Sequence, residues 1–500
     1  MDFLNDARVA LGKGVTSYPK IAPYHPSEPF PEWSKFPLAE DDNPIYRSIR
    51  DLFYQLKLDS KNYGTSAWNP LSKIIQPGNV VILKPNFVYH RNLGEESDGL
   101  TDTDSLVTHG SVIRVVLDYV AKALKGLGKI IVGDCPIQGA DWNQLIQLVG
   151  LDKIQAYFKV FFPSIELAIA DYRLGRAVVK SQMVVERLVD ETSFVNYQEV
   201  DLIEESLLIP LMQGKYEFGV AQYPKHRMHK AHTPYQNKYL FPKDFIEADV
   251  MINLQKMKYH MNAGVTCAMK NLVGINGHKD YLPHFRFGSP KKGGDEYPDG
   301  NWLWDLMWFF YHCDWEIEKG ILKRFFLYAG RTCGILLRVA GFPKRLSSVG
   351  GGSWHGNDTL WRTVLDINRA FFYFNRKTQF IDHQVGSDVK YLAILDGAIG
   401  GQKESPLAPT PIQSGVMMAA FNPLAMDAVA TAMMGLDIKK INQIYEGFSL
   451  KSLPLANFSW ENVKICSDTT LSCIQDIYAQ KAYTPFEPSR GFKGFVEYTR

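Results

Sequence analysis

The sequence predicts an α/β fold: an open, mostly parallel sheet with flanking helices, plus an aromatic-rich helical insertion and an extended N-terminal arm. The first observation is that two apolar, β-branched runs, 80–88 and 128–136, enclose a segment with helical spacing at 110–126. Strand, helix and strand in this order are typical of a parallel sheet. The second observation is that the pattern returns later, with a strand at 391–401 and a strand, an Asn-Pro turn and a helix over 415–435.

The chain of 500 residues divides into five expected regions. The first, 1–75, is an N-terminal arm and a helix, because seven prolines fall between positions 15 and 45 and the apolar residues of 45–58 have helical spacing. The other regions are an α/β core with the main motif at 76–300, an aromatic-rich helical insertion or lid at 301–384, the C-terminal part of the core at 385–450, and a tail at 451–500.

The segment 302–341 is rich in aromatic residues but is interrupted by charges. It does not offer the run of about 18 apolar residues that a membrane span needs. Amphipathic helices of this kind pack on a core, close over a site as a lid, or lie in a membrane interface. We expect core or lid packing, and contact with a membrane surface is the alternative.

Composition favours a globular protein with a small-molecule ligand. The chain is 46% hydrophobic and 22% charged, and its formal net charge is only +2. Because the basic residues cluster locally, we expect a small anionic partner and no nucleic acid. The six cysteines are scattered without a CxxC pair, so we expect no iron–sulfur cluster and a reducing compartment. The first residues contain no apolar run typical of a signal peptide, and we expect a cytoplasmic protein.

Polar side chains follow four of the predicted strands. In an open α/β sheet, ligands gather beyond the carboxyl ends of the strands. If the four strands point the same way, these side chains meet in one cleft that would position a substrate. They are Lys84 and Asn86, Asp134, the group Lys256, Lys258 and His260, and Asp396.

The motif that follows the strand at 250–254 carries the strongest chemical signal. Lys256, Lys258 and His260 alternate with Met257 and Tyr259, so an extended backbone places all three on one side. Cations beside a buried strand are costly unless something anionic lies among them. We interpret the motif as an anion site, and the alternative is a solvated basic edge strand.

A short helix is expected to continue this motif. Thr266 would cap a helix that begins near Cys267, which aims free backbone N–H groups at an anion. Lys270 then lies in the first turn, where its charge opposes the helix dipole unless an anion is bound. The amide of Asn271 would help to orient the substrate.

Two further segments supply histidines. The Gly-rich loop 276–300 contains His284 and several carboxylates, so it provides a general acid–base group, completes a metal site, or is only a surface loop. His226, His229 and His232 are spaced by three residues, which on one helix face would suit a transition metal. Prolines bracket this run, and we favour structural or solvent-facing histidines.

Two acidic residues are the candidate metal ligands. Asp396 ends a predicted strand, and Asp427 lies in an apolar helix, where an unpaired carboxylate is costly. We expect each to ligate a divalent cation or to neutralise a lysine such as Lys270. The alternative for Asp427 is a buried structural ion pair.

The segments KPN, GDCP, LQKMKYHMNAGVTCAMKNLVGINGHKDYLPH and LDGAIGG…PLAMDAVATAMMG resemble the family known as domain of unknown function 362. The resemblance covers about 78–300 and 350–440. Some members of that family carry an iron–sulfur ferredoxin module, and this chain lacks the cysteine run for one.

A looser similarity links the order of His260, Gly264–Thr266 and Lys270 to the nickel-dependent lactate racemase family. In that family a lysine holds the nickel cofactor, so the resemblance implies Lys270 as the attachment point. The chain departs from the family pattern because Ala268-Met269 replaces the Gly-rich dipeptide before the lysine.

Three functions are compatible with these patterns. The leading hypothesis is an enzyme that acts on a small phosphate- or carboxylate-bearing substrate. A divalent metal is an optional part of this hypothesis. The second is a racemase- or epimerase-like enzyme with a nickel cofactor, and the third is a non-catalytic anion-binding or assembly protein. In the leading hypothesis, the substrate-binding residues are Lys84, Asn86, Lys256, Lys258, Thr266 and Asn271, the catalytic residues are His260, His284 and Lys270, and the metal ligands are Asp396 and Asp427.

Overall fold

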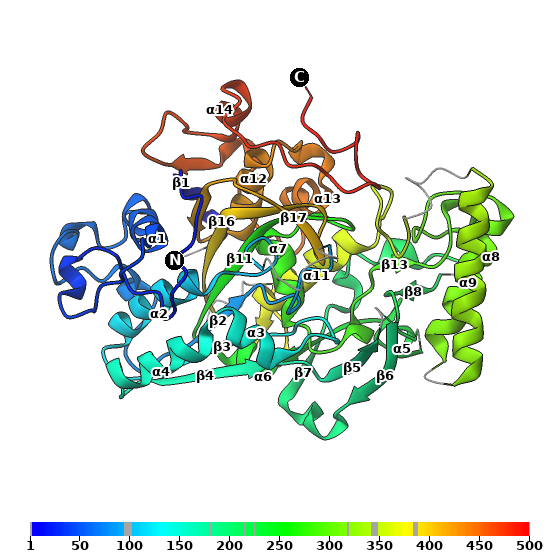
Figure 1. The fold of residues 1–500 in the computed structure, drawn as a ribbon, viewed down its shortest axis with the longest axis horizontal. Coiled ribbons are helices and arrows are strands. Elements are labelled where there is room, and N and C mark those ends of the chain that lie inside the picture. Colours follow the sequence, from blue (N-terminus) through cyan, green and yellow to red (C-terminus); the bar gives the residue numbers. More distant parts are fainter. Residues whose placement is uncertain are drawn as a thin grey trace.

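A large sheet forms the centre of the computed structural model (Figure 1). The structure describes residues 3–94, 103–180, 183–214, 216–224, 226–317, 320–341, 349–383 and 389–499. Across the sheet the strands follow the order β19 (Lys464–Cys466), β1 (Arg8–Lys13), β18 (Val416–Ala420), β16 (Lys390–Glu404), β11 (Val250–His260), β2 (Val80–Pro85), β3 (Lys129–Asp134) and β4 (Glu166–Asp171).

The strands that carry the predicted site run parallel to one another. β11 pairs in parallel with both β16 and β2, and β2 pairs in parallel with β3. Antiparallel pairing is found where β18 meets β16 and β1. The predicted α/β class with an open, mostly parallel sheet is therefore confirmed, and the four strand ends that carry polar residues share one edge.

Helices cover both faces of this sheet. One face packs against α1 (Pro44–Gln55) and α2 (Gly110–Leu124), and the other against α7 (Cys267–Asn271), α11 (Leu360–Tyr373) and α12 (Pro423–Met433). Alternate residues of β11 point to opposite faces. Ile252 and Leu254 pack in the apolar cluster on the side of α1 and α2, and Met251 packs in the cluster on the side of α7, α11 and α12. Burial on both faces explains why the strand appears in the sequence as a continuous apolar run.

A pair of helices stands to the side of the sheet, at the right of Figure 1. These helices, α8 (Trp302–Glu316) and α9 (Ile321–Val339), pack along each other and enclose a small separate cluster that includes Trp304, Trp308 and Leu337. The charges within the pair keep its hydrophobicity below that of a bilayer span. Among the helices described, none is long and apolar enough to cross a membrane.

Shorter elements complete the fold. The remaining α-helices of the described residues are α3 (Trp142–Leu148), α4 (Leu151–Phe161), α5 (His226–Ala231), α6 (Lys243–Glu247), α13 (Asn442–Tyr445) and α14 (Ile474–Ala479). Two further strands extend the large sheet: β12 (Gly264–Val265) pairs with β11, and β17 (Ala408–Ile412) pairs with β16. A three-stranded sheet consists of β7 (Tyr197–Asp201), β10 (Gln236–Pro242) and β9 (His232–Thr233). Three two-stranded pairs are β5 (Gly175–Lys180) with β6 (Met183–Val189), β8 (Phe218–Gly219) with β13 (Phe285–Arg286), and β14 (Phe374–Asn375) with β15 (Phe380–Ile381).

Candidate functional site

A cavity of about 370 Å³ lies beyond the carboxyl ends of β2, β3 and β11. This is the place where ligands bind in open α/β folds. The structure brings eight of the eleven predicted site residues to its wall, and they come from strand ends, from α7 and from the loop before β13. They are Lys84, Asn86, Lys258, His260, Thr266, Lys270, Asn271 and His284.

Lys84 is neutralised by a carboxylate within the cavity wall. Its Nζ lies 2.7 Å from Oδ1 of Asp134, and Oδ2 of Asp134 accepts a hydrogen bond of 2.7 Å from the backbone N–H of Phe87. Gly274 packs directly on this pair, because a Cβ there would lie 2.7 Å from Nζ of Lys84. The Lys84–Asp134 pair therefore shapes the wall, and it leaves little net charge for a ligand.

Lys270 and Lys279 are two cavity lysines for which the described residues provide no partner. Within the part of the chain that the structure describes, neither ammonium group has a hydrogen bond or an ion pair. Lys270 is only partly exposed, and burial, with the nearby charges of Lys279 and Lys84, lowers its pKa to about 7. Burial likewise lowers the pKa of Lys279. Two such groups in one cavity create a demand for negative charge.

Lys258 adds a further amine to the same cavity. Its Nζ donates a hydrogen bond of 2.6 Å to the backbone O of Leu106. Burial and the neighbouring charges of Lys256 and Lys270 lower its pKa well below the usual value. The side chain is fully buried, so it contributes a hydrogen-bond donor even when it is uncharged.

Two buried polar oxygens in the cavity wall also have no partner among the described residues. They are Oδ1 of Asn86 and Oγ1 of Thr266. The amide of Asn86 is oriented by a hydrogen bond of 2.8 Å from its Nδ2 to Oδ1 of Asn271. Buried polar atoms are almost always paired with protein, water or ligand, so these two oxygens mark positions for a bound group.

The two histidines of the cavity have opposite hydrogen-bonding character. Nδ1 of His284 lies 2.7 Å from the carbonyl O of Leu282; because a carbonyl only accepts, Nδ1 carries the hydrogen and Nε2 keeps its lone pair. Nδ1 of His260 instead accepts from the backbone N–H of Asn262 at 3.1 Å, which leaves the hydrogen on Nε2. Burial and the charge of Lys270 lower the pKa of His284 to about 3 and that of His260 well below its usual value.

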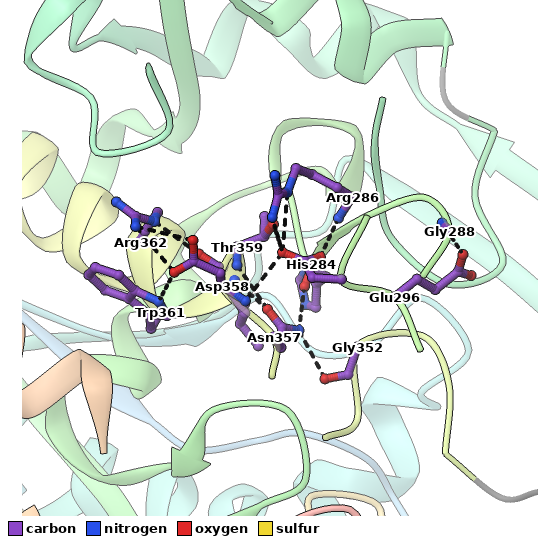
Figure 2. A network of polar contacts seen from close by, with 12 residues as sticks. His284, Arg286, Gly288, Glu296, Gly352, Asn357, Asp358, Thr359, Trp361 and Arg362 are labelled. Carbon is purple, nitrogen blue, oxygen red and sulfur yellow. Dashed lines mark hydrogen bonds and ion pairs between the residues drawn. The ribbon is translucent and has the colours of Figure 1, made fainter. Parts of the chain in front are cut away.

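A polar network fixes the backbone around His284 (Figure 2). Asn357 Nδ2 donates a hydrogen bond of 2.9 Å to the carbonyl O of His284. The buried carboxylate of Asp295 accepts from the backbone N–H of Arg286 at 2.6 Å and from Oγ1 of Thr359 at 2.7 Å. These bonds tie the loop that carries His284 to the start of α11, so the imidazole is held in position before a ligand binds.

Lys256 does not reach the cavity, contrary to the prediction that it binds the substrate. Its Nζ lies 3.2 Å from Oδ2 of Asp396 and donates a hydrogen bond of 2.6 Å to the hydroxyl of Tyr18. Asp396 also accepts from Tyr18 and from the backbone N–H of His109. Asp396 is thus a charge partner of Lys256, one of the two roles expected of it, and its oxygens are fully engaged.

Asp427 does not pair with Lys270, and the expected cap of α7 is replaced. The carboxylate of Asp427 accepts hydrogen bonds from the backbone N–H groups of Ala268 and Met269 at 2.6 and 3.0 Å. Thr266 occupies the N-cap position, but its side chain makes no capping bond. Two of the N–H groups at the start of α7 are therefore satisfied by a carboxylate of the protein itself, and the prediction that they face a bound anion is wrong.

The candidate metal ligands do not fit a metal site. The carboxylate oxygens of Asp396 and Asp427 are engaged in the hydrogen bonds and the ion pair given above, and the two residues lie in different parts of the core. No group of three or more His, Cys, Asp or Glu residues in the described ranges is arranged to hold a metal ion.

The run of histidines near residue 230 also lacks a shared metal-binding face. His229 is exposed, whereas His232 is buried and its Nε2 lies 3.2 Å from the carbonyl O of Tyr281. The side chain of His226 lies outside the described residues. For His232, the favoured structural role agrees with its burial.

Lys279 is a site residue that the sequence patterns did not assign. It belongs to the same basic motif as Lys270 and follows His278. Unlike the residues that the sequence patterns assigned at strand ends, it is the first residue of a short 3-10 helix, Lys279–Tyr281. The turn packs against α5 and β10, and this packing brings Lys279 to the cavity. Its presence in a dense basic motif was the available signal.

Comparison with known proteins finds a family model that resembles the central part of the chain. Residues 216–432 match the model described as "Domain of unknown function (DUF362)". Among solved structures, the lactate racemase apoprotein from Thermoanaerobacterium thermosaccharolyticum is similar at 14% identity and a TM-score of 0.22, over 57% of this chain and 46% of that chain. No curated protein matches. The family match includes the whole motif from Lys256 to His284, so the predicted resemblance to domain of unknown function 362 is confirmed for that part of the chain.

Proposed function

We propose that this chain is an enzyme that acts on a small substrate bearing a phosphate or carboxylate group. The single observation that carries the proposal is the pair of ammonium groups, Lys270 and Lys279, that share one cavity without a counter-ion in the described structure. An anion between them would offset the cost of their burial and raise their pKa values. The unpaired hydroxyl of Thr266 would then donate to the anion, and the unpaired Oδ1 of Asn86 would accept from a hydroxyl or amine elsewhere on the substrate.

Within this proposal, proton transfer belongs to the two histidines. His284 presents the lone pair of Nε2 and is the general base, and His260 presents Nε2–H and is the hydrogen-bond donor. Both are neutral near pH 7, because their pKa values are lowered. A pair with opposite roles supports a reaction that moves a proton on the substrate, rather than simple storage of an anion.

We place this activity in a reducing, cytoplasmic compartment. The support is that all six cysteines are free thiols. Large chains in oxidising compartments commonly pair such residues as disulfides. Expression of the protein in cells as a fusion with a redox-sensitive reporter would test whether its compartment is reducing.

Thermal unfolding with small anions tests the proposal. We expect inorganic phosphate and malonate, each in large excess, to raise Tm of the native protein by about 2–4 °C. The Lys270→Met and Lys279→Met variants should lose this shift, because each removes one of the unpaired cations. Lys291→Met is the matched control, since Lys291 is exposed on a nearby loop.

Two results would overturn the proposal. One is an anion-induced shift of equal size in the native protein and in both cavity variants. The other is the absence of any shift for phosphate and carboxylate ligands at millimolar concentration, provided that all variants retain a cooperative unfolding transition.

A racemase-like reaction is the second candidate. The observation in its favour is that Lys270, the position implied for a covalently held nickel cofactor, opens on the same cavity as His260 and His284. The intact mass of the purified protein separates the two candidates. A mass equal to that of the bare sequence, with no nickel by elemental analysis, would exclude the racemase-like version.

A further inference from the structure

The helix α9 has an apolar face that no described residue covers. Six apolar residues on this side are between 51% and 86% exposed. The opposite side of the helix, with Cys333 and Leu337, is buried against α8. A helix that is apolar on both sides is unusual on a protein surface. A contiguous exposed apolar face of this kind marks a contact site. The exposed residues are Ile321, Phe325, Tyr328, Ile335, Leu336 and Val339.

A row of arginines borders this exposed face. Arg324, Arg331 and Arg338 are spaced by seven residues, so they line up along one edge of the helix. All three are exposed, and none forms an ion pair with a residue in the described ranges. The sequence of α9 contains no Asp or Glu. The edge of the apolar face is therefore purely cationic.

A second cavity, of about 450 Å³, opens between α8 and α9 beside this row. Arg331 and Arg338 line it together with Trp308 and Tyr311 of α8. Ile335 belongs both to this cavity and to the exposed apolar face. The cavity thus joins two guanidinium groups, which suit a phosphate, to an apolar surface, which suits hydrocarbon.

We propose that α9 docks the protein on the surface of an anionic lipid bilayer. The apolar face enters the boundary between headgroups and acyl chains, and Arg324, Arg331 and Arg338 bind lipid phosphates, with one headgroup in the cavity between α8 and α9. Charge complementarity selects this occupant over a second copy of the chain. Two α9 helices packed face to face in antiparallel orientation would bring two arginine rows together, and neither helix offers a carboxylate to either row.

Vesicle co-sedimentation of the full chain tests the proposal. The probes are vesicles of phosphatidylcholine alone and of phosphatidylcholine with phosphatidylglycerol. We expect the protein to sediment with the anionic vesicles and to remain in the supernatant with the neutral ones. Val339→Asp should reduce the bound fraction by about tenfold, because it places a charge in the apolar face. Val160→Asp, at an equally exposed position on α4, should leave binding unchanged.

The arginine row has its own matched pair of variants. Arg324→Gln/Arg338→Gln should weaken binding to the anionic vesicles, whereas Lys153→Gln/Lys159→Gln on α4 should not. The proposal is overturned if the native protein ignores both kinds of vesicle, or if it binds them equally and the arginine variant behaves like the native protein. It is also overturned if light scattering shows a dimer that Val339→Asp converts to a monomer, since the occupant would then be a second copy.

Discussion

At the scale of single residues, the site is defined by charge that the protein does not neutralise itself. Lys84 has Asp134 and Lys256 has Asp396, so these lysines are structural cations. Lys270 has no such partner in the described part of the chain. Its lowered pKa expresses the cost of holding a positive charge in the cavity, and a bound anion recovers that cost.

The lowered pKa of Lys270 predicts how anion binding depends on pH. The pKa of Lys270 is about 7 in the empty cavity and rises when an anion binds. Binding is therefore strongest below pH 7 and weakens as the pH rises toward the pKa of the complex. Sulfate, whose charge is constant over this range, should bind about tenfold more weakly at pH 8 than at pH 6 by titration calorimetry, with proton uptake at pH 8.

The control for this experiment is Lys270→Arg. Arginine stays charged throughout the range, so the variant should bind sulfate with nearly the same affinity at both pH values. An affinity in the native protein that is constant or increases from pH 6 to pH 8 would show that Lys270 does not hold the anion.

At the scale of elements, the short helix α7 depends on a residue of α12. α7 has only the five residues Cys267–Asn271, too few to be stable by itself. Asp427 accepts hydrogen bonds from two of its first N–H groups, and the helices pack in the same apolar cluster. The position of Lys270 in the cavity is thus set by a carboxylate that never touches the ligand.

Removing this carboxylate should destabilise the fold. Asp427→Ala leaves the buried N–H groups of Ala268 and Met269 without an acceptor, and we expect the free energy of unfolding to fall by about 2–4 kcal/mol. Asp427→Asn keeps one acceptor oxygen and should lose about half as much. Urea unfolding measures both values, and a loss under about 0.5 kcal/mol for Asp427→Ala would contradict this role.

At the scale of the whole molecule, the N-terminal arm is joined to the core at Tyr18. Its hydroxyl receives a hydrogen bond from Lys256 and contacts Asp396, and its ring stacks on His109 with centroids 4.2 Å apart. This contact holds residues far apart in the chain and completes a buried cluster of charges. The arm is therefore a part of the core structure rather than a loose extension.

We expect Tyr18→Phe to loosen the arm without affecting the cavity. Loss of the hydroxyl leaves Lys256 and Asp396 with fewer bonds, so trypsin should cleave after the exposed Lys20 and Lys35 at least several times faster. The stabilisation by inorganic phosphate should persist, because Lys256 does not line the cavity. Tyr235→Phe, at a residue that is 87% exposed, is the control; equal cleavage rates for both variants would refute the role of Tyr18.

The sequence predicted the sheet and most of the cavity because both follow from local patterns. Apolar runs that end in polar residues identify parallel strands, and parallel strands bring Asn86 and His260 to one edge. The contacts of Lys256 and of α7 were beyond this reasoning. Their partners, Tyr18 and Asp427, lie 238 and 159 residues away in the chain, and no periodicity in the sequence encodes such a distance.

Gly350 lies between the two cavities described above. It belongs to the wall of the cavity at the sheet edge and to that of the cavity between α8 and α9, and it lies directly under the indole of Trp308. The two cavities therefore share Gly350 as a common wall residue. A larger residue at 350 would push the indole into the helical pair, so we expect the two compartments to have diverged in concert among homologues.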